Sequence, residues 1–422
     1  HREGKIDYDG ALYDELFFEE QTPSTFFAEP TFELHDVTIG KGFHWERRET
    51  QKFAGALKII VENNELTAVN VIGVEDYLLS VISSEMNQNS PEEFLKAHAV
   101  ISRSWVMAQL AHHGKIACDA AERESFLKCG NIEEVVTWLA MHRHSVGNES
   151  HVPEAPSGET EYIRWYDRSD HCNFDVCADD HCQRYQGLTR ATETSVQKAI
   201  DATWGQVLTF GGELCDARFS KCCGGTTELF STCWASDDKA YLPALPDTPG
   251  HLPLDTANAD GTIVVPFCSL ADSPLLARVF NSYDRETTDF YRWTQVYELR
   301  ELSALVREKS GVDIGELTAL DPLAKGASGR IFRLRVVGTK NSFIVGKELE
   351  IRRILSPSHL RSSAFDAEFT SDGRVILRGL GWGHGVGLCQ IGAAVMADRG
   401  YGYRAILEHY YPGTQVSESL SK

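Results

Sequence analysis

The sequence has no long hydrophobic run and comparatively few basic residues. No apolar stretch approaches the roughly 18 residues that a membrane-spanning helix needs, so we expect no membrane span in this chain. Lysine and arginine number 41 against 61 aspartate and glutamate residues, which gives a net charge of −20. That charge repels polyanions, and no basic run with interleaved aromatics offsets it. We therefore expect neither nucleic acid nor an anionic membrane surface as a partner.

Internal repeats and low-complexity blocks are also absent, which argues against a repeat architecture. The 422 residues are 42% hydrophobic and 24% charged, an ordinary globular composition. This length suits one large domain or two modest ones. The chain begins at His1 rather than at Met, so we expect that a preceding segment, such as a signal peptide, has been removed.

The eleven cysteines are an odd number and are clustered. One cluster runs from Cys172 to Cys182, and a second contains Cys215, Cys222, Cys223 and Cys233. In a chain with ample core, such clusters indicate metal ligands or local pairing more than a disulfide scaffold.

The secondary structure pattern predicts strands first and helices next. Residues 1–30 have no clear period and are expected to form an irregular lead-in, whereas residues 32–71 show short β-branched runs broken by Asn-Asn and Gly. Residues 74–82 then change to helical spacing. A second helix is predicted from Ser90 as N-cap, with Pro91 at the first position and Glu93 closing a capping box. Its apolar stripe comprises Phe94, Ala97, Ile101, Trp105 and Ala108.

The rest of the chain is mixed. Residues 112–162 are polar, rich in His and Glu, and are interpreted as an insertion. The remaining predictions are a hairpin in 205–220, an amphipathic helix ending at Gly311, strands paired around Lys340-Asn341, and two helices in 388–411.

Three local patterns carry residues suited to chemistry. Glu85 lies between the two predicted helices, where partial desolvation would raise the pKa of its carboxyl group and suit a general acid. A solvated loop glutamate is the simpler interpretation of this spacing alone. Residues 171–182 hold two His and three Cys, which can close around zinc or instead form a disulfide. Residues 379–387 hold five glycines around Trp382 and His384, which favours either close approach to a ligand or a packed turn.

Several separated motifs, in order, resemble the SpoIID/LytB family of cell-wall proteins. They are VEDYLLSVISSEM with the following KAHAVISRSW, then GGTTE, SGRIFRLRVVG, LRSSAFDAE, and GWGHGVGLCQIGAAVMADRGYGYRAILEHYYPGT. These motifs span roughly residues 65 to 416. The resemblance implies an α+β fold in which a curved β-sheet and packed helices form a long substrate groove. We accordingly divide the chain into an N-terminal lead-in and β-rich segment, 1–64, and a catalytic domain, 65–416, with the insertion near 112–162.

The resemblance implies a lytic transglycosylase that cleaves the MurNAc–GlcNAc bond of peptidoglycan and leaves 1,6-anhydro-MurNAc ends. Glu85 matches the family's catalytic glutamate. A single carboxyl group can protonate the glycosidic oxygen and then accept the proton of the muramyl 6-hydroxyl. No water is consumed, so the second carboxylate of a hydrolase is unnecessary. The implied location is exported, either periplasmic or associated with the cell envelope.

The resemblance also implies a zinc site formed by His171, Cys177 and Cys182, with water or His181 as fourth ligand. This zinc would be structural, since the proposed chemistry needs no metal-activated water. A family segment similar to SNSGG is replaced here by SKCCGG, whose cysteines could join a second metal site or pair with Cys215 or Cys233.

Substrate contacts are expected from the glycine-rich segments and from tryptophans that can stack on sugars. The predicted contacts are His384, Gln390, Trp382, Gly224 and Gly225. Trp105 and Trp234 are further stacking candidates, and for each tryptophan a core position is the competing interpretation. Arg103 is expected to be structural.

Two other classes of function compete with the transglycosylase. One is a non-catalytic peptidoglycan-binding protein that enhances a cell-wall amidase, which would then be its partner. The other is a zinc hydrolase of the wall with metal-bound water as nucleophile. Chelation would abolish the activity of the hydrolase, whereas loss of the Glu85 carboxylate would abolish that of the transglycosylase.

Overall fold

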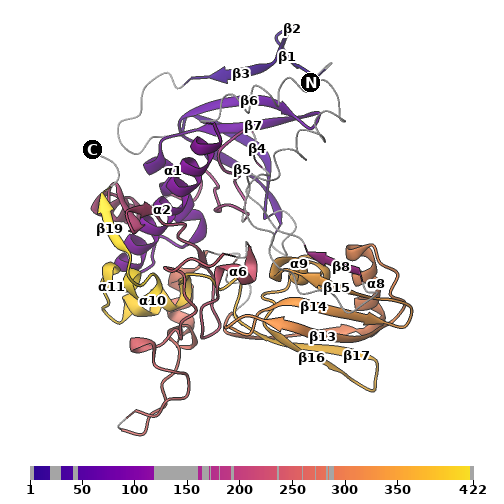
Figure 1. Cartoon of the computed structure of the whole chain (residues 1–422). Coiled ribbons are helices and arrows are strands. Elements are labelled where there is room, and N and C mark those ends of the chain that lie inside the picture. Colours follow the sequence, from indigo (N-terminus) through magenta and orange to yellow (C-terminus); the bar gives the residue numbers. More distant parts are fainter. Residues whose placement is uncertain are drawn as a thin grey trace.

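The computed structural model describes residues 4–19, 30–40, 46–117, 160–163, 171, 173–179, 181–191, 194–234, 237–258, 260–270, 272–281, 284 and 289–418. It shows a mixed α and β protein, in agreement with the predicted α+β class (Figure 1). Most of the predicted insertion, residues 118–159, lies outside the described residues. Within the described ranges, no helix is both long and apolar enough to cross a membrane.

The N-terminal part of the chain is built from antiparallel strands. They are β1 (Ile6–Tyr8), β2 (Ala11–Tyr13), β3 (Glu15–Phe18), β4 (Phe32–Ile39), β5 (Arg47–Phe53), β6 (Ala56–Glu62) and β7 (Glu65–Val71). The sheet order is β3-β6-β7, and β1 pairs with β2 and β4 with β5. The expectation of an irregular lead-in was wrong for residues 6–18, because β3 adds its backbone hydrogen bonds to the edge of β6.

The turn between β6 and β7 confirms the predicted hairpin. Asn63 and Asn64 both have positive φ, 49° and 61°, as a two-residue turn with matching strand twist requires. The predicted domain boundary between residues 64 and 65 falls within this turn. The two strands pair from Ala56–Val71 to Glu62–Glu65, so the hairpin itself is one unit.

A helical region follows, around two long helices. Its helices are α1 (Val74–Glu85), α2 (Glu92–Ala117), α5 (Thr194–Ala202), α6 (Phe230–Cys233), α7 (Ser273–Val279), α10 (Gln390–Asp398) and α11 (Tyr403–Tyr410), with short 3-10 turns η2 (Pro249–His251) and η3 (Phe267–Ser269). Short strands lie beside them: β9 (Gln206–Phe210), β10 (Glu213–Leu214) and β19 (Gln415–Glu418) in one sheet, and β11 (Phe219–Ser220) parallel to β18 (Leu388–Cys389).

Helix α2 is the centre of this region. Phe94 and Ile101 pack in a core with α10 and α11, while Leu95 and Trp105 pack in a second core with α1 and α5. The helix is therefore buried on two faces rather than along one stripe. The predicted capping box was wrong: the Glu93 carboxylate accepts from Lys96 and from the backbone N–H of Tyr403, so it ties α2 to α11 instead.

Arg103 has the expected structural role. Its buried guanidinium donates to both carboxylate oxygens of Glu75, at 2.7 and 2.6 Å, and so fastens α2 to α1. A third donor reaches the carbonyl oxygen of Gln206 at 2.9 Å. Because every charge in this contact is paired and hydrogen-bonded, the buried arginine is tolerated.

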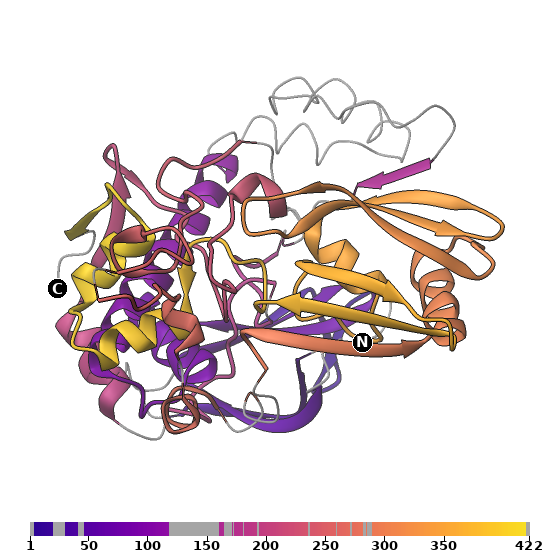
Figure 2. The same cartoon turned by 90° about the horizontal axis from the view of Figure 1, so that it is seen from below.

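The strand-rich C-terminal region contains two sheets around a third core. One sheet has the order β13-β14-β15-β8 and the other β12-β17-β16. The elements are β8 (Thr160–Ile163), β12 (Arg292–Glu298), α8 (Leu299–Ser310), β13 (Leu317–Lys325), β14 (Ile331–Gly338), β15 (Ser342–Gly346), α9 (Glu348–Ile354), β16 (Phe365–Phe369) and β17 (Arg374–Leu380). Figure 2 shows these strands on one side of the molecule, opposite α2, α10 and α11.

The predicted elements of this region are confirmed. Helix α8 ends at Gly311, which has a left-handed φ of 75°, and β14 and β15 pair across Lys340-Asn341. Helix α9 was missed, because the alternation of charged and apolar residues at the start of its sequence, ELEIRRI, is also typical of a strand. The end of the predicted insertion forms β8, which pairs in parallel with β15. The curved groove remains a prediction.

Candidate active site and metal centre

Glu85 occupies the last position of α1, and its side chain is only 7% exposed. Its Oε1 atom accepts the backbone N–H of Arg184 at 3.1 Å. The end of α1 is held from the other side by Asn281, whose amide donates to the carbonyl oxygens of Ser83 and Ser84. The simpler interpretation of a solvated loop glutamate is therefore wrong: the carboxyl group is buried, and the adjacent backbone is fixed.

The segment that contacts Glu85 is packed against both long helices. Tyr185 stacks on Tyr77 of α1 with ring centroids 5.3 Å apart. Gln183 accepts a hydrogen bond from the Tyr77 hydroxyl and donates to the carbonyl oxygen of Ser102 in α2. Arg184 is thus placed by its two neighbours in sequence, which fixes its N–H beside Glu85.

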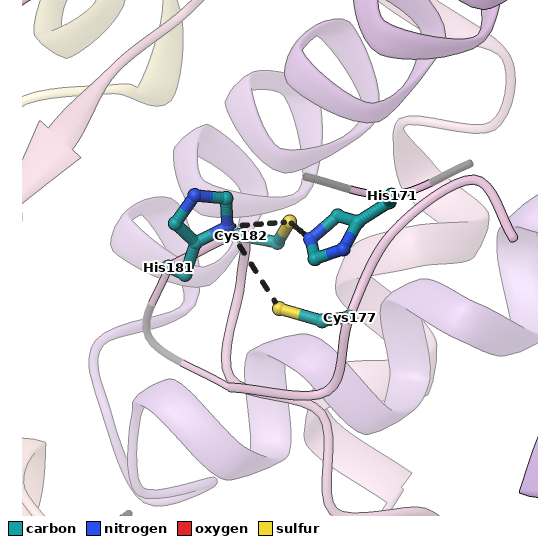
Figure 3. Close-up of side chains that lie close together, drawn as sticks. All are labelled: His171, Cys177, His181 and Cys182. Atoms are coloured by element: carbon teal, nitrogen blue, oxygen red, sulfur yellow. Dashed lines mark hydrogen bonds between the residues drawn. The ribbon is translucent and has the colours of Figure 1, made fainter. Parts of the chain in front are cut away.

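Four predicted metal ligands converge directly before this segment. The donor atoms of His171, Cys177, His181 and Cys182 all lie within 4.8 Å of one another (Figure 3). The Cys182 sulfur is 3.4 Å from His171 Nε2 and 3.5 Å from His181 Nδ1. The loop is closed by the Tyr185 N–H, which donates to the carbonyl oxygen of Ala178 at 2.9 Å.

These residues fit a tetrahedral zinc ion. Bond lengths of about 2.3 Å to sulfur and 2.0–2.1 Å to nitrogen place S and N atoms roughly 3.6 Å apart in a tetrahedron. The observed 3.4 and 3.5 Å agree with that separation, whereas Cys177 Sγ and His181 Nδ1 are 4.0 Å apart, slightly further. Of the two predicted fourth ligands, the structure brings His181 into the group. Cys172 lies outside the described residues.

Interactions within this group shift the pKa values of its two thiols in opposite directions. The hydrogen bond from Cys182, followed by that from His181, lowers the pKa of Cys177 to about 3, while the neighbouring Cys177 raises the pKa of Cys182. Thiolate is the form of cysteine that binds metals, so the hydrogen bonds to Cys177 favour the metal-binding form.

An aspartate that the sequence did not single out lies beside this site. Asp284 accepts from the Arg184 guanidinium at 3.3 Å and from the Lys221 ammonium at 3.1 Å. Arg184 therefore contacts Glu85 through its backbone and Asp284 through its side chain. No motif indicated Asp284, because its two partners come from segments 100 and 63 residues away.

The glycine-rich segment places His384 in a second part of the site. Its Nδ1 atom accepts the backbone N–H of Val386 at 3.0 Å, and its ring packs edge-on against Trp234. Burial, and then the nearby charges of Arg218 and two other arginines, lower the pKa of His384 well below 6.5. The same Arg218 charge acts on Cys182, so this arginine links the two parts electrostatically.

The tryptophan candidates differ in position. Trp105 is buried in the α1–α2 core, so stacking on sugar is wrong for it. Trp234 has the Arg218 guanidinium 4.3 Å from its ring centroid. Trp382 is half-buried, packs against Phe290 at 5.0 Å and has Arg361 at 5.4 Å from its ring. The Trp382 backbone pairs with that of Cys222 through two hydrogen bonds.

The remaining predicted contacts are held in buried structure. The Gln390 amide is 1% exposed and contacts His98 Nε2 at 3.1 Å, which favours a structural role. Gly224 and Gly225 are buried and have φ of 83° and 116°. A Cβ atom at Gly224 would lie 2.9 Å from the backbone nitrogen of Gly381. This close approach of two backbones accounts for Gly224 without a ligand.

Comparison with known proteins connects this arrangement to one family. A family model described as stage II sporulation protein matches residues 62–210, and a domain of unknown function matches residues 228–387. The chain is 25% identical over 365 residues to an uncharacterized protein of Brachyspira hyodysenteriae, covering 86% of this chain and 72% of that protein.

Two named relatives from Bacillus subtilis agree. Stage II sporulation protein D is 23% identical over 374 residues, covering 88% of this chain and 82% of the relative. The amidase enhancer is 28% identical over 255 residues, covering 56% of this chain but 34% of the relative, so the match reaches about a third of that protein. Together these matches confirm the resemblance to the SpoIID/LytB family. Glu85 and the His171–Cys182 group both fall within the part matched by the sporulation model.

Proposed function

We propose that this protein is a peptidoglycan lytic transglycosylase that cleaves the MurNAc–GlcNAc bond of glycan strands and leaves 1,6-anhydro-MurNAc ends. The observation that carries the proposal is the buried Glu85 carboxyl group, held by the Arg184 N–H at the end of α1. A desolvated carboxyl group with one fixed oxygen suits proton transfer to and from a bound sugar. Membership of the SpoIID/LytB family supports a substrate in the cell wall.

Glu85 would act twice in one turnover. Its carboxylic acid first gives a proton to the glycosidic oxygen as the bond from that oxygen to C1 of MurNAc breaks. The muramyl 6-hydroxyl oxygen then bonds to C1, and the Glu85 carboxylate accepts the hydroxyl proton. The carboxylic acid is restored, and neither water nor a second carboxylate is needed. Asp284 is ion-paired with Arg184 and Lys221, so it suits positioning of those cations rather than proton transfer.

Zinc is the second part of the proposal. His171, Cys177, His181 and Cys182 would hold the ion. Four protein ligands leave no open position, so bound zinc would supply structural cross-linking. The loop that these residues form leads within two residues to Arg184, whose N–H contacts Glu85. The metal site and the acid/base are thus connected through a short piece of backbone.

Substrate contacts would come from the glycine-rich region in a long groove. His384 is the best supported of the five predicted residues, because a neutral ring whose Nδ1 already accepts from Val386 carries its proton on Nε2. Trp382 is half-buried and would offer one ring edge. Gln390, Gly224 and Gly225 would act by supporting this region. We also propose that the protein works outside the cytoplasm, in the periplasm or cell envelope.

The test is mass spectrometry of peptide-stripped glycan strands after incubation with wild type and Glu85→Gln. We expect 1,6-anhydro-MurNAc ends from the wild type and a loss of roughly 10²- to 10⁴-fold in the variant. Glu348→Gln is the matched control, since Glu348 is equally buried but lies in α9 and pairs with Arg352. Reducing ends instead of anhydro ends would show hydrolysis and contradict the proposal.

A second candidate function is favoured by the amidase enhancer relative. In this case the protein binds glycan strands and stimulates a cell-wall amidase without cleaving them. The same experiment separates the two functions. A folded, zinc-loaded wild type that binds glycan but yields no cleavage product would favour the enhancer, and its amidase partner would then be sought.

A further inference from the structure

A second group of metal-ligand side chains lies in the core beneath α10. The donor atoms of Cys223, Asp247, Cys268 and Cys389 all lie within 4.8 Å of one another, and all four residues are buried. They come from the loop after β11, the loop before η2, η3 and the end of β18. Both the first and last ligands lie outside the 228–387 domain match.

The distances within this group agree with one tetrahedral ion. The sulfurs of Cys223 and Cys268 are 3.7 Å apart, and Cys223 Sγ is 3.5 Å from Asp247 Oδ2. Zinc bonds of about 2.3 Å to sulfur and 2.0–2.2 Å to oxygen place S and S roughly 3.8 Å apart, and S and O roughly 3.5 Å. A disulfide would bring the sulfurs to about 2.05 Å. An iron–sulfur cluster needs its thiolates further apart, because the inorganic core lies between them.

We propose that Cys223, Asp247, Cys268 and Cys389 bind a single divalent transition-metal ion of the zinc type, at a site separate from the His171–Cys182 group. Four protein ligands and complete burial make this a closed, structural site. It joins segments that are up to 166 residues apart in the chain. The proposal does not depend on the transglycosylase activity.

The surrounding hydrogen bonds orient the ligands as a metal site requires. Asp247 Oδ1 accepts from the Tyr410 hydroxyl at 2.7 Å and lies 3.5 Å from His409 Nε2. These contacts direct Oδ2 toward the sulfurs, where it also accepts the Cys268 N–H at 3.2 Å. Partners of this kind, which hold a ligating carboxylate from behind, are usual around bound metals.

The sulfur of Cys389 is placed to act as a thiolate. It accepts backbone N–H groups from Cys223 at 3.2 Å and from Gly392 at 3.4 Å. Cys389 is also the N-cap of α10, where the helix dipole favours negative charge. A Cβ atom at Gly392 would lie 2.6 Å from Asp247 Oδ2 and would also meet the Tyr410 hydroxyl, so glycine leaves the room that the carboxylate needs.

A buried cation offsets part of the charge of this group. Three thiolates and one carboxylate around a divalent ion leave two negative charges, which the core would not tolerate alone. The Arg330 guanidinium is fully buried and donates to the carbonyl oxygens of Cys223 at 3.0 Å and Cys222 at 3.3 Å. The positive charge of Arg330 therefore lies beside the backbone of Cys223, one of the four proposed ligands.

The experiment isolates this site by using the Cys177→Ser/Cys182→Ser variant, in which the first group is disabled. Native mass spectrometry should find one zinc per chain in this variant, against two in the wild type loaded under reducing conditions. Replacement by Co²⁺ should give sulfur-to-cobalt charge-transfer absorption at one equivalent. Adding Cys268→His should retain the ion but weaken this absorption, because one thiolate is replaced by imidazole.

Cys215→Ala is the matched control, since Cys215 is a buried cysteine outside the group. Added to the same background, it should leave metal content and absorption unchanged. A background variant that is folded but binds no metal would overturn the proposal. So would a Cys223–Cys268 disulfide in protein kept under reducing conditions, or an absorption spectrum that Cys268→His does not alter. All three outcomes are readable without any glycan-cleavage assay.

Discussion

The two groups of metal-ligand side chains in this protein are built in opposite ways. The first, His171 to Cys182, spans twelve residues of one loop and is partly exposed. The second, Cys223 to Cys389, gathers four segments from across the C-terminal half of the chain and is entirely buried. The ligands of the first group lie on a single loop, so they are close together before the rest of the chain folds around them. The ligands of the second group come together only when the core is assembled.

This difference indicates which property of the protein each group affects. An ion in a local loop orders that loop, and here the loop leads to the N–H that contacts Glu85. An ion between distant segments stabilises the whole fold, because binding free energy is available only to the folded chain. We therefore expect the first group to affect catalysis and the second to affect stability.

The largest effect should come from removing a ligand of the buried group. Cys389→Ala should lower the free energy of unfolding by at least about 3 kcal/mol, because it leaves the Asp247 carboxylate and two thiols buried around an incomplete site. Cys177→Ala should lower it by about 1 kcal/mol or less, because only a loop is released. Urea unfolding followed by circular dichroism measures both.

The control for this comparison is Cys215→Ala, which removes a buried thiol of the same size without touching either group. Its loss should be about 0.5–3 kcal/mol, as for most point mutations. Equal losses for Cys389→Ala and Cys177→Ala would erase the distinction between a global and a local site.

The next largest effect concerns catalysis. Cys177→Ser should lower kcat for glycan cleavage by roughly 10- to 100-fold, a typical range for disturbing the residues that orient a site. The change should fall mainly on kcat, because the variant frees the Arg184 N–H that positions Glu85 rather than a group that binds sugar. Steady-state kinetics on peptide-stripped strands would show it. An unchanged kcat would mean that the loop does not position Glu85.

A further effect depends on pH and concerns the buried His98 of α2. Burial, and then the Lys221 charge, lower the pKa of His98 from 6.5 to about 3. Between these values the unfolded chain binds a proton that the folded chain does not, so stability rises with pH across this window and is lost as pH falls below 6.5. The slope contributed by His98 should be at most about 1.4 kcal/mol per pH unit.

The measurement is the free energy of unfolding at pH 4, 5, 6 and 7 in wild type and His98→Gln. Glutamine keeps a polar side chain near Ser102 and Gln390, the two hydrogen-bond partners of His98, but does not titrate. The variant should show a flatter pH dependence than the wild type. Parallel curves would show that His98 is not buried as a neutral ring.

Much of the fold could be predicted from local sequence signals. Asn63-Asn64 and Gly311 mark a turn and a helix end because few other residues adopt the positive φ needed there. The turn at Lys340-Asn341 was marked instead by two polar residues between two predicted strands. The strands of the lead-in could not be predicted, since β3 is stabilised by pairing with β6 some 40 residues later. Glu93 similarly has one of its two partners, the Tyr403 N–H, in α11, besides Lys96 in its own helix. Sequence periodicity does not contain such distant contacts.

The candidate site likewise contains residues that the sequence indicated and residues that it did not. Spacing indicated a possible metal site among the His and Cys residues of 171–182, and the family resemblance selected His171, Cys177 and Cys182 and the catalytic role of Glu85. Asp284 could not be found, because its partners Arg184 and Lys221 are distant in sequence. Cys268 and Asp247 were missed for the same reason. The cysteine pair at 222–223 gave the only local signal that a second site could exist.

The smallest predicted effect concerns the ion pair between the segment that follows the His171–Cys182 loop and strand β5. Arg190 follows its loop and pairs with Glu49 of β5 at 2.9 Å, with side chains 21% and 27% exposed. Because water screens a pair that is this exposed, a double-mutant cycle with Arg190→Met and Glu49→Gln should give a coupling energy of only about 0.5–1 kcal/mol. The more exposed pair Lys340–Asp313, with side chains 62% and 51% exposed, is the control and should give no measurable coupling. A coupling of several kcal/mol for Arg190–Glu49 would mean that the N-terminal strands, and not the metal ligands alone, fix the loop beside Glu85.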